Sequence, residues 1–113
     1  MLPQKNRLRK KDDFQKVYQK GSFSALGDIS LKKVPNNLSE ARVGFIVEKK
    51  FFKKAVERNR IKRILRDFTR KNISQISQGL DVVIFYKSKE REIDSKKITS
   101  TLEKLFKRTN LLK

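Results

Sequence analysis

The sequence contains no cysteine and no histidine among its 113 residues. It therefore cannot use thiol nucleophiles, disulfides, imidazole acid–base catalysis or the usual zinc ligands. No stretch approaches the roughly 18–20 apolar residues of a membrane span. The first twenty residues carry seven Lys or Arg and no apolar run, which does not fit a signal peptide. We therefore expect a cytoplasmic protein.

Acidic residues are also scarce, with 12 Asp and Glu against 30 Lys and Arg. A nuclease that carries its own active site is expected to show a cluster of metal-binding carboxylates or a histidine base. Asp12 and Asp13 are better suited to capping a helix, and Glu90, Glu92 and Asp94 alternate with basic residues. We expect no catalytic residue and no metal ligand in this chain.

The length and hydrophobic content suit a single domain over residues 1–113, because 36% hydrophobic residues in 13.3 kDa can fill one compact core. Half of the net charge of +18 lies in residues 49–71, with eleven basic and two acidic side chains. Disordered basic tails lack apolar residues, whereas this segment includes Ile61, Ile64 and Leu65. The pattern predicts a folded basic surface whose partner is a polyanion, nucleic acid above all.

The N-terminal part predicts one helix and two strands. Asp12 and Asp13 precede apolar residues at i, i+3 and i+4, which predicts a short helix with an Asp N-cap, ending near Gly21. Residues 28–34 begin with period-two alternation and predict a strand. Residues 42–47 predict a second strand, antiparallel to the first, after a turn at 35–37.

Two apolar stripes in the middle of the chain differ in helical phase. Phe52, Ala55 and Val56 cluster on one side of a helical wheel, and the stripe that begins at Ile61 lies roughly 170° away. One straight helix cannot bury both stripes, so we expect a turn or short helical piece at 51–56. The main helix is expected to begin near Arg58 and to bury the second stripe, which comprises Ile61, Ile64, Leu65 and Phe68.

The C-terminal part predicts a strand and a helix. Residues 80–86 are almost continuously apolar, as in a central strand covered on both faces. Asp94 and Ser95 are expected to cap a last helix, whose apolar face holds Ile98, Leu102, Leu105 and Phe106. The order α-β-β-α-β-α predicts an α+β fold, a two-layer α-β sandwich. Strands 42–47 and 80–86 form a βαβ unit with the helix between them if they are parallel.

The main helix has a strongly basic face opposite its apolar stripe. Five residues fall within an arc of roughly 100°, and Arg58 and Arg60 flank it; the five are Asn59, Lys62, Arg63, Arg66 and Arg70. Guanidinium groups bind phosphate oxygens in pairs, and the helix N-terminus adds a partial positive charge. Solvated helix faces usually mix signs, so this one favours binding of a polyanion.

The aromatic pair Phe14 and Tyr18 lies at i, i+4 in the first helix. From the residues alone, such a pair is more often part of a core than a platform on which bases stack.

Several segments together resemble the protein subunit of bacterial ribonuclease P. Residues 54–66 resemble its "RNR" signature, with Arg58-Asn59-Arg60 preceded by Ala-Val and followed by Ile-Lys-Arg. Residues 7–18 resemble the family's basic opening with its paired aromatics. Arg42-Val43-Gly44 and the helix at 102–106 also match, in the same order along the chain.

The resemblance implies a ribonucleoprotein that removes the 5′ leader of precursor tRNA, with the chemistry carried by the catalytic RNA and its Mg²⁺ ions. It implies that the RNR helix binds that RNA through Arg58, Asn59, Arg60, Lys62, Arg63 and Arg66, to which the basic face adds Arg70. It implies that the single-stranded leader lies between the first helix and the sheet, on Phe14, Tyr18, Lys32, Lys49 and Lys50. No protein partner and no membrane contact are implied.

The resemblance also implies the fold of the second domain of ribosomal protein S5, with a left-handed βαβ crossover, although about 98% of parallel crossovers are right-handed. The segments Glu48-Lys49-Lys50 and Phe51-Phe52-Lys53-Lys54 depart from the family pattern. The residues leave two alternatives open. One is a ribosomal or other structural RNA-binding protein, and the other is a DNA-binding module that reads the major groove with its basic helix.

Overall fold

A computed structural model describes residues 3–48, 54–87 and 93–111. Within these ranges the chain forms, in order, η1 (Gln4–Asn6), α1 (Lys11–Lys20), β1 (Ser22–Leu26), β2 (Ile29–Pro35), β3 (Arg42–Val47), α2 (Ala55–Lys71), η2 (Ile73–Gln75), β4 (Leu80–Tyr86) and α3 (Ser95–Arg108). None of the helices described there is long and apolar enough to cross a membrane.

The four strands form one mixed sheet in the order β1-β2-β4-β3. β2 pairs antiparallel with both β1 and β4, while β3 pairs parallel with β4. The prediction of a central strand at 80–86 is confirmed, since β4 lies inside the sheet and most of its residues are buried. The predicted strands at 28–34 and 42–47 do run antiparallel, but β4 lies between them.

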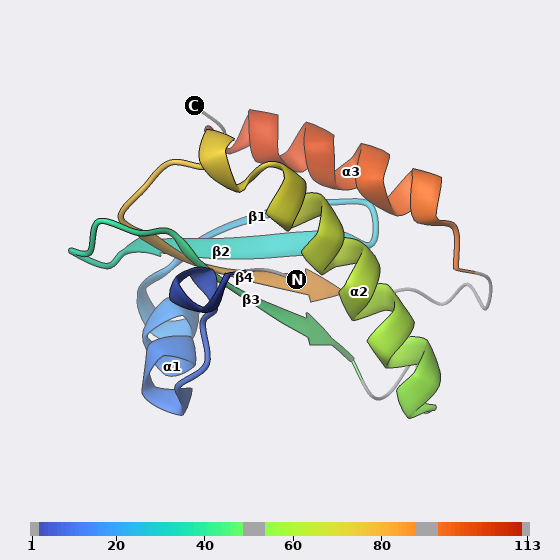
Figure 1. The fold of residues 1–113 in the computed structure, drawn as a ribbon, viewed down its shortest axis with the longest axis horizontal. Helices are drawn as coiled ribbons and strands as arrows, with labels where there is room; N and C mark the ends of the chain where they lie inside the picture. Colours follow the sequence, from blue (N-terminus) through green and yellow to red (C-terminus); the bar gives the residue numbers. More distant parts are fainter. Residues whose placement is uncertain (1–2, 49–53, 88–92, 112–113) are drawn as a thin grey trace.

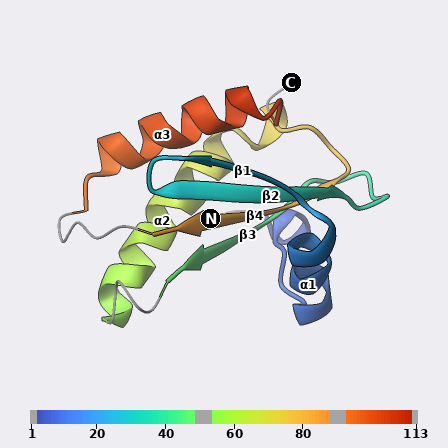
Figure 2. The ribbon, with the colours of Figure 1, turned by 180° about the vertical axis from the view of Figure 1, so that it is seen from behind.

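The sheet has a helix layer on each face. The odd-numbered side chains of β3 and the even-numbered ones of β4 pack under α2 and α3 in the main core, and the alternate side chains meet α1 in a smaller core. Figures 1 and 2 show α2 and α3 on one face and α1 on the other, near one end of the strands. The predicted α+β sandwich is confirmed. The sheet and the α2–α3 layer are its two predicted layers, and α1 adds a helix on the second face, part of which it leaves open.

The crossover from β3 through α2 to β4 is left-handed. In Figure 1, α2 lies in front of the sheet, both strands run to the right, and β4 lies above β3. The structure therefore departs from the right-handed rule for parallel βαβ units, as the family resemblance implies.

Three details of the predicted elements are wrong. Strand β1 was not predicted, because it is an edge strand whose residues are mostly exposed and lack an alternating apolar pattern. It joins β2 through a tight turn at Gly27, whose φ of 58° suits glycine. Helix α1 has Lys10 rather than an aspartate as its N-cap; Asp12 and Asp13 lie in the first turn, and the Asp13 carboxylate pairs with Arg42.

The third correction concerns the start of α2. The helix begins at Ala55, within the segment predicted as a separate turn, and it does not bury the first apolar stripe: Val56 is 78% exposed. One helix indeed does not bury both stripes. The helix continues through Val56 and leaves its side chain in solvent. Phe52 lies outside the described residues.

A partly buried ion-pair network joins α1 to the sheet. Arg42, at the start of β3, donates from Nε and Nη2 to the two carboxylate oxygens of Asp81 on β4, at 2.8 and 2.7 Å. Its Nη1 also donates to Asp13 of α1 at 3.2 Å. Asp81 is only 1% exposed and also accepts from Asn36 at 2.9 Å. The hydrogen bond with Asp81 raises the pKa of Arg42, so the guanidinium stays charged.

Replacing Arg42 with alanine should lower the free energy of unfolding by about 3 kcal/mol, because it leaves the Asp81 carboxylate buried without its cation. Urea denaturation would measure this loss. The matched control is R63A, which removes the same side chain from an exposed position on α2 and should change stability by no more than about 0.5 kcal/mol. Equal losses in the two variants would contradict a structural role for the network.

Candidate RNA-binding surfaces

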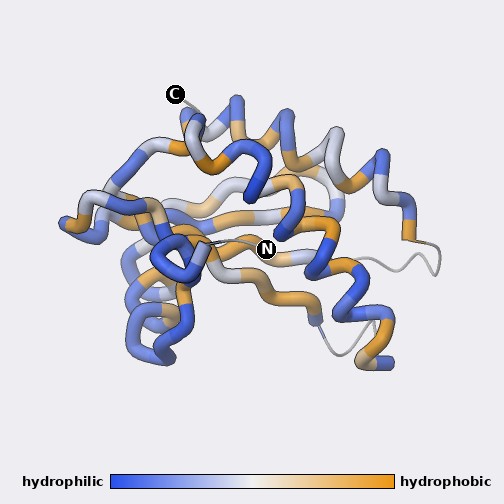
Figure 3. The backbone as a smooth tube through the Cα atoms, viewed as in Figure 1, coloured by the Kyte–Doolittle hydropathy of each residue, from blue (hydrophilic) through white to orange (hydrophobic). Residues whose placement is uncertain are grey.

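The first surface is the basic face of α2. Ile61 and Leu65 are fully buried against the sheet and α3, and this orientation turns the opposite side of the helix outward. Figure 3 shows hydrophilic and hydrophobic residues alternating along α2, as this two-sided packing requires.

All seven predicted residues of this surface lie on one helix and reach solvent. Asn59, Arg60, Arg63 and Arg70 are exposed, and Arg58, Lys62 and Arg66 are half-buried. Among the described residues, no ion pair neutralises Lys62, Arg63 or Arg66. The face therefore presents a field of one sign, which suits a phosphate backbone.

The helix N-terminus lies one turn before the Arg58-Asn59-Arg60 triplet, earlier than predicted. Because α2 begins at Ala55, the Arg58-Asn59-Arg60 triplet lies in and beyond its first turn, and the Arg58 N–H already donates to the carbonyl of Lys54 at 3.2 Å. The Arg58 backbone N–H is therefore not free for a ligand, and the donors that Arg58 offers are those of its side chain.

The second surface lies on the other face of the sheet, beside α1. A depression of about 220 Å³ is lined there by Tyr18, Phe23, Ser30, Lys32, Glu48, Phe85 and Lys87. The rings of Tyr18 and Phe85 lie with centroids 5.6 Å apart. Lys32 Nζ donates to the Tyr18 carbonyl at 3.0 Å and lies 5.9 Å from the centre of its ring.

This depression combines open aromatic rings with ammonium groups. Tyr18 is 37% exposed and Phe23 is 62% exposed, so both offer ring surface to solvent. Partial burial raises the pKa of Tyr18, which keeps its hydroxyl protonated and able to donate a hydrogen bond. Stacking rings with nearby cations are typical of sites for single-stranded nucleic acid.

The structure separates the two predicted aromatics. Tyr18 lines the depression, whereas Phe14 belongs to the small core and packs on Gly44 of β3. A Cβ at Gly44 would lie 2.5 Å from Cζ of Phe14, so only glycine allows the ring to approach this closely. The core interpretation made from the residues alone thus suits Phe14, and the platform interpretation suits Tyr18.

The sequence missed Phe23, Phe85 and Lys87 as members of this surface. Phe23 lies on the unpredicted strand β1, and Phe85 lies in a continuous apolar run that does not reveal which face is open. Lys87 pairs with Glu48 at 3.5 Å, so the departure from the family pattern at Glu48 places a carboxylate at this edge. Lys49 and Lys50 lie outside the described residues.

Carboxylates do not gather into a metal site in the described ranges. No group of three or more Asp or Glu residues there is placed to hold a metal ion. The arrangement offers cations that can bind phosphate and rings on which bases can stack.

Comparison with known proteins identifies the family of the chain. A family model described as Ribonuclease P matches residues 2–110. The chain belongs to the ribonuclease P protein family. It is 46% identical over 85 residues to the ribonuclease P protein component of a Pseudanabaena species, covering 74% of this chain and 73% of that protein. It is 38% identical to that of Caldanaerobacter subterraneus, covering 93% and 90%.

Solved structures give the same result for the fold. The Staphylococcus aureus RNase P protein superposes with a TM-score of 0.87 and 28% sequence identity, over 96% of this chain and 98% of that one. Members of the ribonuclease P protein family are components of an endoribonuclease complex, which implies an RNA partner for this chain.

The contact between Phe14 and Gly44 can be tested by a double-mutant cycle. Replacing Gly44 with alanine should lower stability by about 1–3 kcal/mol, because the new methyl group overlaps the Phe14 ring. Adding F14L should recover part of that loss by removing the overlapping ring atoms. Strictly additive losses in thermal or urea unfolding would show that the two residues do not constrain each other.

Proposed function

We propose that the chain is the non-catalytic protein subunit of ribonuclease P, and that it assists removal of the 5′ leader from precursor tRNA. The observation that carries the proposal is the pair of surfaces on opposite faces of one sheet. One is a rigid basic helix face and the other is an open aromatic depression, so one domain can contact two RNA elements at once.

The α2 face is the proposed site for the catalytic RNA. Three of its cations, Arg60, Arg63 and Arg70, are exposed arginines. The opposite side of α2 packs in the main core, which holds the helix in place. A rigid row of guanidinium groups suits a folded RNA whose phosphates have fixed positions.

The depression beside α1 is the proposed site for the leader. Tyr18 and Phe85 would stack on bases, and Lys32 would contact phosphates. Lys49 and Lys50 follow Glu48 in the sequence and are proposed as further phosphate contacts. Every base offers a π-face, so this site would bind leaders with little sequence preference, as a subunit that serves many precursors requires. Phe14 packs on Gly44 and in this proposal holds α1 against β3.

The chemistry is proposed to belong to the catalytic RNA and its Mg²⁺ ions. The described carboxylates form no cluster that could hold Mg²⁺ in the protein, and hard cations of this type take oxygen ligands, which phosphates supply. The role of the chain in this proposal is to hold both RNAs.

The direct test is cleavage of a 5′-extended precursor tRNA at low Mg²⁺, with catalytic RNA alone, protein alone and both together. Efficient cleavage is expected only with both. Cleavage by the protein alone would contradict the assignment of chemistry to the RNA. No gain from adding the protein would favour a ribosomal or other structural RNA-binding role.

Assembly with the catalytic RNA should depend on the exposed arginines of α2. Replacing Arg63 and Arg70 together with alanine should reduce affinity and flatten the salt dependence, by about 0.9 in the log–log slope for each lost phosphate contact on duplex-like RNA. A titration of binding against salt would measure the slope. The control is K104A, which removes an exposed lysine from α3. An unchanged slope in the double variant would show that these arginines do not contact phosphate.

Leader recognition should depend on the Tyr18 ring. Y18A should weaken binding of precursor tRNA to the holoenzyme about 5-fold or more, since stacking on an aromatic ring contributes about 1–3 kcal/mol per base. Y18F keeps the ring and should retain most of the affinity. Mature tRNA lacks the leader, so an equal loss with mature tRNA would contradict the proposed site.

A further inference from the structure

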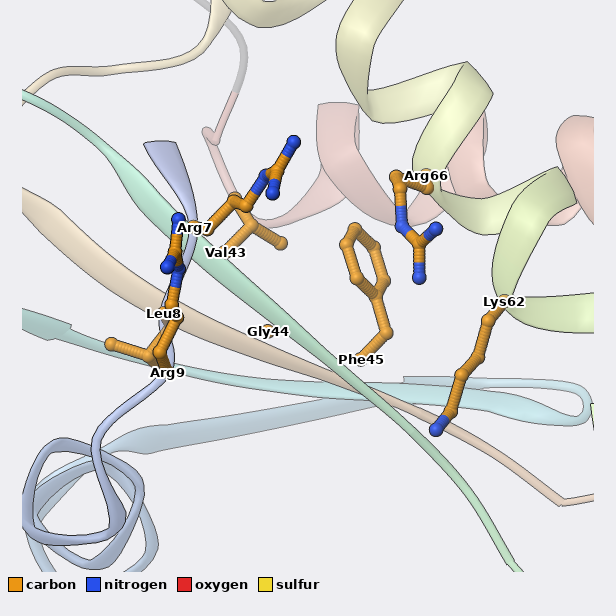
Figure 4. A pocket seen from close by; sticks show the side chains of 8 residues that line it. All are labelled: Arg7, Leu8, Arg9, Val43, Gly44, Phe45, Lys62 and Arg66. Carbon is orange, nitrogen blue, oxygen red and sulfur yellow. The ribbon is translucent and has the colours of Figure 1, made fainter. Parts of the chain in front are cut away.

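A second hollow, distinct from the depression beside α1, lies along the edge of β3 that faces away from β4. It has a volume of about 430 Å³ and is lined by Arg7, Leu8, Arg9, Val43, Gly44, Phe45, Lys62 and Arg66. The segment 7–9 forms one wall, the edge of β3 forms the floor, and α2 forms the other wall. We call it the β3-edge groove. Figure 4 shows Lys62 and Arg66 extending from α2 toward it, with the Phe45 ring between the two walls.

The groove is lined by cations of two separate chain segments and by no carboxylate. Arg7 and Arg9 come from the segment before α1, and Lys62 and Arg66 come from α2. Within the described ranges no ion pair involves Arg9, Lys62 or Arg66. These three cations lie around one small hollow, and like charges at such close range repel each other unless an anion lies between them.

The floor of the groove offers backbone donors as well. Leu8 N–H donates to the Val43 carbonyl at 3.1 Å, so the polar backbone groups of Val43 point away from β4. Backbone groups alternate in direction along a strand, which turns the N–H and carbonyl of Phe45 toward the same edge. The half-buried Phe45 ring stands beside them and presents an aromatic surface.

The position of the groove identifies which RNA can reach it. The Phe45 side chain lies on the face of the sheet that carries α2, whereas Tyr18 and Phe85 lie on the opposite face. Lys62 and Arg66 belong both to the groove and to the basic face of α2. An RNA seated on α2 therefore reaches the groove directly.

We propose that the β3-edge groove binds one unpaired nucleotide of the catalytic RNA. The base stacks on Phe45, and the flanking phosphates lie between Arg9 on one wall and Lys62 and Arg66 on the other. RNA-binding proteins commonly recognise nucleotides that are splayed out of a helix and stacked on aromatic rings. The inference rests on the proposed function, since it names a further contact of the same RNA.

Site-directed crosslinking tests the proposal, because the chain has no native cysteine. R9C, coupled to a photoactivatable aryl azide and assembled with the catalytic RNA and precursor tRNA, should crosslink to a short unpaired segment of the catalytic RNA. R63C is the positive control for the α2 face, and K104C is the negative control on α3. Each assembled variant is first checked for cleavage activity and for an unchanged circular dichroism melt.

The outcomes distinguish the groove from the proposed function. Crosslinks from R63C without any from R9C would overturn the groove and leave the function standing. Crosslinks from R9C to the leader or to a duplex would also overturn the groove. No crosslink from either position, together with no gain in cleavage, would overturn both proposals.

A second test measures the affinity of two variants for the catalytic RNA. F45L keeps most of the buried apolar volume but removes the ring, and it should weaken binding to the catalytic RNA about 5-fold or more. R9A should flatten the salt dependence by about 0.7, the value for a contact to a single strand. Wild-type affinity in both variants, with intact folding, would overturn the proposal.

Discussion

The bidentate pair between Arg42 and Asp81 is the constraint on which both faces of the protein depend. It lies where parallel strands β3 and β4 begin, and Asp13 extends it to α1. Charge pairs buried in this way require their full set of partners, because an unpaired carboxylate in the interior is costly. The Arg42 guanidinium thus links β3 to β4 and also to α1, the helix that carries Tyr18.

The two faces of the sheet carry different helices and different candidate binding surfaces. Alternation along β3 and β4 sends one set of side chains to α2 and α3 and the other set to α1. The basic helix face, the β3-edge groove and the aromatic depression are all held by side chains of this sheet or of helices packed on it. In the proposed function, this rigidity sets the distance between the catalytic RNA and the leader.

The charge of +18 has a structural consequence as well. Apart from the pair at Arg42, the described ion pairs are at the surface and contribute little to stability. Most cations in the described ranges take part in none of these pairs, and so many like charges repel each other in the compact state. An RNA partner would relieve this repulsion, and the buried apolar core holds the fold until it binds.

The sequence by itself determined the elements with strong periodicity: the central strand at 80–86, the last helix with its Asp94 cap, and the basic face of α2. These depend on local spacing and on capping. Only the tertiary structure revealed β1, the separate places of Phe14 and Tyr18, and the contributions of Phe23, Phe85 and Phe45. Those depend on which strand neighbours which and on where a helix leaves a face open, and contacts between residues distant in sequence decide both.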